Sequence, residues 1–496
     1  MRVLFVVAVL ASLAIAAPAH AATFVVTKKG DSLDFVCNAD CSLRDAVTAA
    51  NADPAADEIV LPAGVLRLSL LMVENTNIAG DLDVTSDLTI RGAGAAATTI
   101  QSAAGDRVLD LHGAAADLRL LDLTVTGGRA LAPNDFGGGI RSQGTGELSL
   151  ERVVVRDNFS QGAASNGHGG GIYKGAGRLV VRDSAIVGNQ ALSSGFGGGI
   201  FLNALGTSAE LTNVTIAENY AGSSGGGIYS NHAIPAALVH VTVAGNEAGS
   251  SNGGIDGDAA SFRLRSSIVA ANAAPANPDC GPSFAPLSDG GNVGPPACGL
   301  TQSSDAQTGD PALGPLSATA IPVREPLAGS PALDRAVGPC PAADARGLPR
   351  PQGAACDAGA AELAVLPAAV PAAGVSPAPR LLALPRKLRL KGGKIAVPLR
   401  CAAGARCTGS LKLTAAARRG RASAQAVVVL GRRAFAIPGG KRATVRAPLS
   451  AAGRRAIRGR KGIRATLTVR LTGASRAQTA KVRIARRSQR PRGTTS

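Results

Sequence analysis

Aromatic residues are scarce in this sequence of 496 residues. It contains no tryptophan, three tyrosines and ten phenylalanines, and Phe435 is the only aromatic residue beyond residue 385. Proteins that bind single-stranded nucleic acid stack the bases on aromatic side chains. The C-terminal part of the chain lacks such a platform, and we therefore predict no specific nucleic-acid partner.

Acidic residues are missing from the C-terminal part of the chain. Residues 386–496 contain 30 Lys and Arg and no Asp or Glu, whereas residues 1–385 contain 22 basic and 34 acidic residues. The two parts carry formal charges of +30 and −12, which give the net charge of +18. The positive electrostatic field of the C-terminal part attracts anionic cell-wall polymers, acidic polysaccharides or lipid phosphates through salt-sensitive contacts. The alternative is that a genomic bias toward Arg and Ala codons produces the basic surface, and that this surface has no dedicated partner.

Long apolar runs are absent after the N-terminus. Segment 1–21 begins with Arg2, continues in an apolar run and ends in the small-x-small triplet Ala19-His20-Ala21. This pattern is typical of a signal peptide. No later stretch of about twenty residues is apolar enough to cross a bilayer. We therefore predict an exported, secreted or cell-surface protein with no transmembrane helix in the mature chain.

Patterns for catalysis and metal binding are also missing. No Cys or His residues cluster at the two-residue spacing that zinc needs. The sequence has no Asp-Asp doublet of the kind that hydrolases use as paired carboxylates, and Asn-x-Asp occurs only at Asn38, Asn51 and Asn277. His168, within a Gly-His-Gly triplet similar to that of polygalacturonases, is interpreted as a loop residue. We predict no catalytic residue, no metal ligand and no cofactor.

Cysteines, in contrast, are present in close pairs. All eight follow the predicted signal peptide, which indicates an oxidising compartment. Pairing between sequence neighbours is the simplest of the many possible connectivities. It predicts disulfides between Cys37 and Cys41, Cys280 and Cys298, Cys340 and Cys356, and Cys401 and Cys407.

One sequence motif is repeated through the middle of the chain at intervals of about thirty residues. Gly-Gly-Gly-Ile stands at 137–140, 169–172, 197–200 and 225–228, and fades to Gly-Gly-Ile at 253–255. Within each repeat apolar residues alternate, shift by one position at a bend and alternate again. Alternation indicates strands, and too few residues separate the strands for a crossover helix. In each repeat the alternating apolar residues are followed by an asparagine. These asparagines are Asn158, Asn189, Asn219, Asn246 and Asn272.

Stacked repeats of this kind predict an all-β fold, a parallel β-helix over residues 58–275. We expect a right-handed winding because parallel connections are overwhelmingly right-handed. The asparagines are expected to form a ladder in which each amide bonds its neighbours about 4.8 Å above and below. The glycines allow a turn with positive φ just before Ile enters the core. The two phrases are similar to the repeats of polymorphic outer-membrane proteins and other adhesin-like β-helices.

Residues 22–57 are expected to cap the β-helix. Ser42 and Asp45 have the spacing of a capping box, and Leu43, Ala46 and Val47 share one helical face. A short helix here covers the open end of the β-helix, whose strands otherwise offer unpaired edges. The stretch CSLRDA at 41–46 resembles the CSLREA-type N-terminus of secreted bacterial repeat proteins, with Asp45 where that pattern has Glu.

Residues 276–362 are rich in Pro, Gly and Cys. The segment carries DPALGPL at 310–316, GSPALD at 329–334, DARG at 344–347 and CDAGAAE at 356–362. These motifs resemble the choice-of-anchor Q domain of exported bacterial proteins, which implies a surface location and no reaction. Its charged residues form either a catalytic cluster or a network that holds irregular backbone, and we favour the network. They are Asp334, Asp344, Arg346, Arg350, Asp357 and Glu362.

The remaining C-terminal chain divides at a change of composition. Residues 363–385 are rich in Ala, Pro and Val and predict an extended linker. Residues 386–496 show short alternating stretches separated by Gly-rich turns, which predict a small basic β-sandwich.

Five residues follow the repeated Ile positions and predict an outward-facing column. Because Ile faces the core, we expect these residues to face solvent and to form a binding surface for a sugar chain. Stacked aromatics also arise simply because β-surfaces favour them. Near the end of the column, Asp256 and Asp258 come nearest to the Asp cluster that a pectate lyase needs beside an Arg base. The candidate ligand-binding residues are Arg141, Tyr173, Phe201, Tyr229 and Asp256.

These patterns favour an exported, adhesin-like binding protein whose basic C-terminal region tethers it to acidic polymers. The alternative is a polysaccharide lyase or glycoside hydrolase that acts on an acidic polysaccharide. A carboxylate pair, or Arg and Asp within hydrogen-bonding reach on one coil face, would favour the enzyme. The sequence itself names no ligand and gives no oligomeric state.

Overall fold

The computed structural model describes residues 20–72, 74–103, 105–132, 135–162, 167–204, 206–257, 262–281, 286–364, 381–402, 406–416, 427–458, 460, 462–472 and 477–486. The chain divides into two compact units, Met1–Val365 and Leu366–Ser496. Residues 1–19 of the predicted signal peptide and most of the predicted linker lie outside the described residues. Within the described ranges, no helix is long and apolar enough to cross a membrane.

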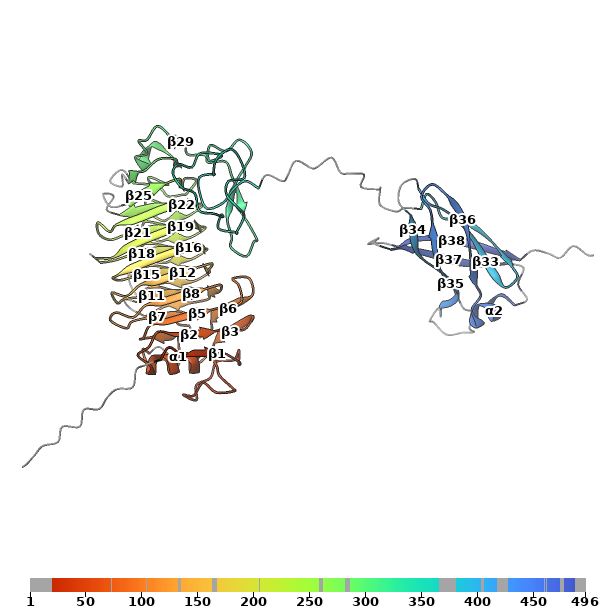
Figure 1. The fold of residues 1–496 in the computed structure, drawn as a ribbon, viewed down its shortest axis with the longest axis horizontal. Coiled ribbons are helices and arrows are strands. Elements are labelled where there is room, and N and C mark those ends of the chain that lie inside the picture. The colour runs from red at the N-terminus through yellow and green to blue at the C-terminus, as the bar shows by residue number, and fades with distance from the viewer. Residues whose placement is uncertain are drawn as a thin grey trace, which may run out of the picture. The chain divides into compact units, whose positions relative to one another are not determined.

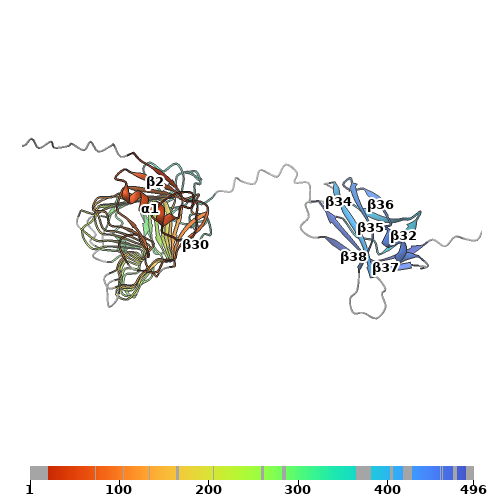
Figure 2. The ribbon, with the colours of Figure 1, turned by 90° about the horizontal axis from the view of Figure 1, so that it is seen from below.

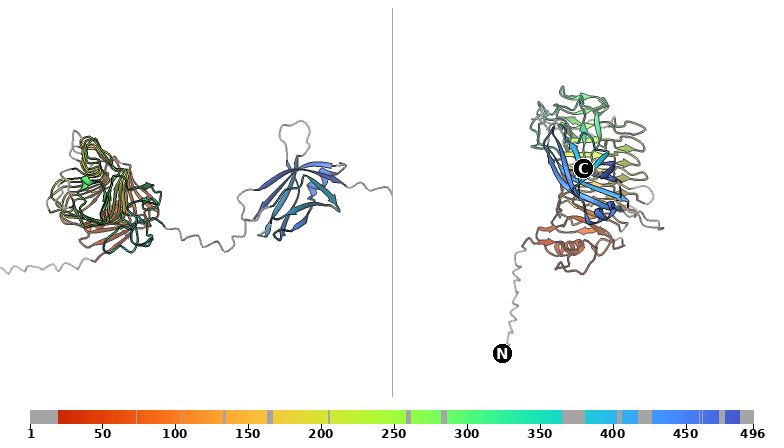
Figure 3. Two further views of the ribbon diagram at one scale, coloured as in Figure 1. Left: turned by 90° about the horizontal axis from the view of Figure 1, so that it is seen from above. Right: turned by 90° about the vertical axis from the view of Figure 1, so that its right-hand side faces the viewer.

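The first unit is a parallel β-helix of about seven turns, as the repeat predicts (Figures 1 and 3). One of its sides, which we call the column sheet, takes one strand from each turn in the order β4-β7-β11-β15-β18-β21-β24. All neighbouring strands of this sheet are parallel. The strands are β4 (Leu82–Val84), β7 (Leu109–Leu111), β11 (Ile140–Ser142), β15 (Ile172–Lys174), β18 (Ile200–Leu202), β21 (Ile228–Ser230) and β24 (Ile255–Gly257).

Two further sheets complete the turns. In the described part of the chain, five short strands form one sheet: β10 (Arg129–Ala130), β14 (Phe159–Ser160), β17 (Gln190–Ala191), β20 (Tyr220–Ala221) and β23 (Glu247–Ala248). The large sheet contains β1 (Thr23–Val25), β2 (Asp57–Val60), β3 (Gly64–Leu68), β5 (Leu88–Arg91), β6 (Thr98–Ser102), β8 (Leu118–Leu121), β9 (Thr124–Thr126), β12 (Leu148–Glu151), β13 (Val154–Arg156), β16 (Arg178–Val187), β19 (Ser208–Ala217), β22 (Ala236–Ala244), β25 (Phe262–Arg265), β26 (Ile268–Val269), β27 (Leu287–Ser288), β28 (Val293–Gly294) and β29 (Ala306–Gln307).

A single bend residue turns each coil of the large sheet. Asp122, Arg152, Asp183, Asn213 and His240 occupy this place with φ between 48° and 58°. In this left-handed conformation the chain changes direction within one residue. This is the bend at which the alternation of apolar residues shifts by one position.

The predicted asparagine ladder is confirmed. Asn158 donates from Nδ2 to Asn189 Oδ1 at 3.0 Å, and the same bond joins each later pair down to Asn272 at 2.9–3.0 Å. The first glycine of each Gly-Gly-Gly-Ile phrase has φ between 65° and 70°, as predicted. The third glycine lies against the ladder, where a Cβ at Gly199 would come within 2.6 Å of the carbonyl oxygen of Gly227. The Gly-Gly-Gly-Ile motif and the asparagines therefore pack against each other in each turn that carries the motif.

The N-terminal end carries the predicted helix, α1 (Leu43–Ala52), which Figure 2 shows across the end of the coils. Ser42 and Asp45 form the capping box, with each side chain accepting from the backbone N–H of the other. The Arg44 side chain is fully buried, donates to Asp31 Oδ1 at 2.9 Å and binds the carbonyl oxygens of Ala79 and Gly80. The helix is thereby anchored to the first turns of the β-helix.

The C-terminal segment of this unit packs along the side of the later coils (Figure 1). It contains a 3₁₀ turn at Pro296–Cys298 and the antiparallel strands β30 (Leu313–Leu316) and β31 (Arg324–Pro326). Asn213 Nδ2 donates to the Ala343 carbonyl at 2.8 Å, and Ala360 N–H donates to Thr242 Oγ1 at 2.9 Å. The segment is therefore bound to the bend side of the coils.

The four predicted disulfides are confirmed. Each cysteine bonds its predicted sequence neighbour, with S–S distances between 1.97 and 2.13 Å. Disulfides persist in oxidising compartments, so this pairing fits an extracellular protein.

The second unit is all-β, as predicted, with one short helix, α2 (Ala451–Ile457). Its described strands form one sheet in the order β35-β34-β37-β38-β32-β33-β36. The sheet nearly closes into a barrel, since the edge strands meet in a bridge between Gly431 and Leu449. It therefore replaces the two packed sheets expected of a sandwich. The strands are β32 (Lys387–Lys391), β33 (Lys394–Arg400), β34 (Cys407–Ala416), β35 (Val427–Ile437), β36 (Arg442–Pro448), β37 (Gly462–Leu471) and β38 (Gln478–Arg486).

Candidate functional site

The five candidate ligand-binding residues do form one column on the column sheet. Arg141, Tyr173, Phe201, Tyr229 and Asp256 are direct partners in successive parallel strands. The same register continues toward the N-terminus with Asp110 and Asp83, which the sequence analysis did not include. We call these seven residues the outer column. It places an acidic end, an arginine and three aromatic rings on one side of the β-helix.

The expectation that the column faces solvent is wrong for two of its residues. Tyr173 is 6% exposed and Phe201 is 3% exposed. The loops before β11, β15 and β18 fold back, and each lays a second ring on the column. Ring centroids lie 4.8 Å apart for Phe136 and Tyr173, and 4.6 Å apart for His168 and Phe201.

The loop rings and the column rings form one aromatic stack. Its interplanar angles within the column are 5° and 7°, and Phe196 tilts against Tyr229 at 46°. Tyr229, Phe196 and Phe136 keep part of their surface exposed. The stack therefore presents its loop rings and its C-terminal end to solvent, while the inner rings support them.

His168 belongs to this stack. Its Nδ1 accepts a hydrogen bond from the Phe196 backbone N–H at 3.2 Å. Burial disfavours the imidazolium and lowers the pKa of His168 to about 4. A neutral imidazole in contact with three phenyl rings acts here as an aromatic packing residue in a loop, consistent with its interpretation from sequence.

A buried acidic cluster lies at the N-terminal end of the outer column. Its carboxylates are each 5% exposed or less and belong to Asp81, Asp83, Asp106, Asp110 and Asp135. The two arginines among them are Arg107 and Arg141. Burial is the largest cause of the raised pKa of Asp81, Asp106 and Asp135. Five acids lie against two arginines, and burial favours the neutral form of Asp81, Asp106 and Asp135.

The arginines join these carboxylates into one network. Arg141 donates from Nε to Asp110 Oδ1 at 2.8 Å, and its Nη1 lies 3.5 Å from Asp135 Oδ1. Arg107 bonds the same carboxylate of Asp135, and its Nε lies 3.2 Å from Asp81 Oδ2. An Arg and Asp cluster within hydrogen-bonding reach on one coil face is the feature that favours an enzyme.

Sequence reasoning missed the acidic cluster because the glycine phrase is absent from the first turns. Leu82-Asp83-Val84 and Leu109-Asp110-Leu111 align with Ile140-Arg141-Ser142 only when the register is known. The apolar-acidic-apolar pattern of the first two triplets is the sequence signal that could have placed Asp83 and Asp110 in the outer column. At the other end of the column, Asp256 accepts from the N–H of Gly257, and Asp258 lies outside the described residues.

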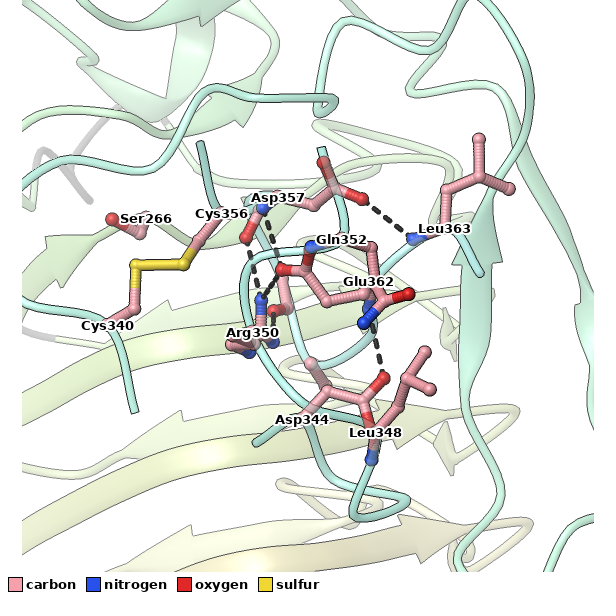
Figure 4. Close-up of polar contacts among 12 residues, drawn as sticks. Ser266, Cys340, Asp344, Leu348, Arg350, Gln352, Cys356, Asp357, Glu362 and Leu363 are labelled. Atoms are coloured by element: carbon pink, nitrogen blue, oxygen red, sulfur yellow. Dashed lines mark hydrogen bonds and ion pairs between the residues drawn. A yellow bond between two sulfur atoms is a disulfide. The ribbon is translucent and has the colours of Figure 1, made fainter. Parts of the chain in front are cut away.

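The charged residues of the C-terminal segment form a structural network, shown in Figure 4. Arg350 is buried, donates to Glu362 Oε1 at 2.5 Å and binds the carbonyl oxygens of Asp357 and Gly359. The Glu362 carboxylate also accepts the backbone N–H groups of Gln352 and Asp357.

Two more carboxylates of the segment bind its backbone in the same way. Asp344 accepts from the N–H groups of Arg346, Leu348 and Glu362. Asp357 accepts from those of Asp334 and Leu363. Carboxylates engaged in this way hold irregular backbone in place, which supports the network interpretation over a catalytic one.

Comparison with known proteins gives no identification. A scan against protein-family models finds no match, and a search of curated proteins finds no related sequence.

Proposed function

We propose that this chain is an exported cell-surface or extracellular binding protein of adhesin-like type, tethered to acidic polymers by its basic C-terminal unit. The observation that carries the proposal is the placement of charge on the C-terminal sheet. All Lys and Arg side chains between residues 386 and 485 that the structure describes are exposed. The same stretch of sequence contains no acid that could neutralise them.

Like charges stand directly opposite one another on neighbouring strands of this unit. Arg483 pairs in register with Lys387 on one side and with Arg464 on the other. Arg400 is opposite Arg442, and like charges directly opposite one another destabilise a sheet. A surface that costs stability in this way fits a role in binding a polyanion, which removes the repulsion.

The β-helix supplies a second surface that suits a carbohydrate. Tyr229 and Phe196 are partly exposed beside each other, with ring centroids 4.6 Å apart. Apolar ring faces next to polar groups are favourable contacts for the faces of a sugar ring. We propose that the exposed part of the aromatic stack binds a glycan chain.

The tether is tested with a charge-neutralised protein. We expect the full chain to bind immobilised polyphosphate and polygalacturonate, but not neutral dextran, with an affinity that falls as salt rises. Substituting Lys387→Gln, Arg464→Gln and Arg483→Gln together removes one in-register row, so the slope of log affinity against log salt should fall by up to about 3.

The matched control removes three exposed arginines from the β-helix: Arg91→Gln, Arg119→Gln and Arg263→Gln. Net charge changes equally, but binding should stay close to that of the unmodified protein. Equal loss in both triple variants, or binding that salt does not affect, would show that the C-terminal row is not the tether.

A second candidate function rests on the acidic cluster. Arg141 and Asp110, next to the aromatic stack, suit a lyase or hydrolase acting on an acidic polysaccharide. If so, the full chain should release unsaturated products or reducing ends from polygalacturonate or alginate. Arg141→Gln should then lower the rate at least about 100-fold. Arg178→Gln, which removes a partly exposed coil arginine, should leave the rate unchanged.

A further inference from the structure

Two strands of the column sheet bring three potential metal ligands together. Asp83 of β4 and Asp110 of β7 are direct partners in register. His112 follows two positions after Asp110, so both side chains point away from the core. One ligand atom from each residue lies within 4.8 Å of the others.

We propose that Asp83, Asp110 and His112 bind a divalent transition-metal ion, with Zn²⁺ as the best fit. The site shares Asp110 with the second candidate function, but the proposal depends on neither proposed function. Imidazole together with carboxylates is a donor set that suits zinc. Three protein ligands leave one position of a tetrahedral ion open to water or to a substrate oxygen.

The spacing of Asp83 and His112 provides an independent argument. Asp83 is 1% exposed, yet its Oδ1 makes no hydrogen bond, and neither does His112 Nε2. These two atoms lie 3.2 Å apart. Two ligands of a tetrahedral zinc ion with bonds of about 2.0 Å are separated by about 3.3 Å. A carboxylate oxygen and an imidazole nitrogen at this separation are well placed to share a cation.

The surroundings of Asp83 favour the same role. Its other oxygen, Oδ2, accepts the Asn77 backbone N–H at 2.7 Å, which fixes the orientation of the carboxylate. Such outer contacts are typical of metal ligands. On the open side, the His112 side chain is 27% exposed, so an ion can reach the site from solvent.

The placement of the arginines also leaves room for a cation at Asp83. Two arginines face five buried carboxylates, and Arg141 neutralises Asp110 through a two-pronged contact. Asp83 has no arginine partner among the ion pairs of the described residues. The competing explanation is a protonated His112 that forms a simple ion pair with Asp83, in which case no metal binds.

The experiment titrates Zn²⁺ into the mature chain, purified without a histidine tag and treated with a chelator. Calorimetry should show one saturable site. Replacing Zn²⁺ by Co²⁺ should give a visible absorption band that reports on the ligands. His112→Gln changes a partly exposed residue and should lower the Zn²⁺ affinity at least tenfold and shift the Co²⁺ band. Asp83→Asn should have an effect of the same size.

The control is His232→Gln, which removes an exposed histidine from the same unit and should leave the affinity unchanged. Circular dichroism confirms that each variant remains folded. An unmodified protein without a saturable Zn²⁺ site overturns the proposal and favours the ion pair. So does a His112→Gln variant that binds Zn²⁺ as tightly as the unmodified chain, or a His232→Gln variant that loses as much affinity.

Discussion

Replacing Asn219 by alanine lowers the free energy of unfolding of the β-helix by about 3–5 kcal/mol. Asn219 Oδ1 accepts both the backbone N–H and the side-chain amide of Asn189, at 2.9 and 3.0 Å. Its Nδ2 donates to the Ile186 carbonyl and to Asn246 Oδ1. Alanine removes these four hydrogen bonds in a place that is 1% exposed, and Asn246 Oδ1 keeps only the bond from the backbone N–H of residue 219.

The interior position of Asn219 in the ladder makes the loss larger than that of a single bond. Each coil contacts only its neighbours, so a weakened interface between two turns can separate the stack at that point. Urea denaturation followed by circular dichroism, with the disulfides intact, measures the effect.

The control for this prediction is Asn231→Ala. Asn231 is exposed, and its side chain makes one bond at 3.2 Å, to Asn203 Oδ1. Its substitution should change the free energy of unfolding by less than about 0.5 kcal/mol. Similar losses at Asn219 and Asn231 would show that the ladder adds nothing beyond ordinary surface bonds.

The parts of the fold that repeat were predictable from the sequence. The Ile and Asn positions recur because every turn packs in the same way. The third glycine recurs because the glycine carbonyl of the next coil and the Asn amide occupy the space of its Cβ. The capping box of α1 and the four neighbouring disulfides are local patterns, and both were predictable for that reason.

The features that depend on how loops fold, or on whether a sheet closes into a barrel, were not predictable. Phe136, His168 and Phe196 stand one residue before the glycine phrase, and alternation does not say that the loop folds back over Tyr173 and Phe201. For the C-terminal unit, alternation shows which side of a strand faces the core. It does not show whether the strands close into one sheet or pack as two.

The acidic cluster was missed for a different reason. Asp83 and Asp110 belong to the first turns, where no glycine phrase marks the register, while Asp106 and Asp135 come from the loops between strands. Their proximity arises from stacking alone. A cluster assembled in this way is visible only once the strands are placed side by side.

Replacing Arg350 by methionine lowers the free energy of unfolding by about 3–5 kcal/mol, because it leaves Glu362 as an uncompensated buried charge. The side chains of both residues are 0% exposed, and they are joined at 2.5 Å. Arg350 also lies 3.3 Å from Asn213 Oδ1 of a coil bend, so its loss weakens the attachment of the C-terminal segment to the β-helix. Urea denaturation measures the stability, and limited proteolysis of residues 334–362 reports the detachment.

A second substitution distinguishes the loss of charge from the loss of packing. The double variant Arg350→Met with Glu362→Gln removes the uncompensated carboxylate and should recover part of the lost stability. Arg119→Met breaks an exposed pair with Glu151 and should cost less than about 1 kcal/mol. If the double variant is as unstable as Arg350→Met alone, the arginine acts mainly through packing and its carbonyl contacts. In that case the buried ion pair is not what holds the segment against the coils.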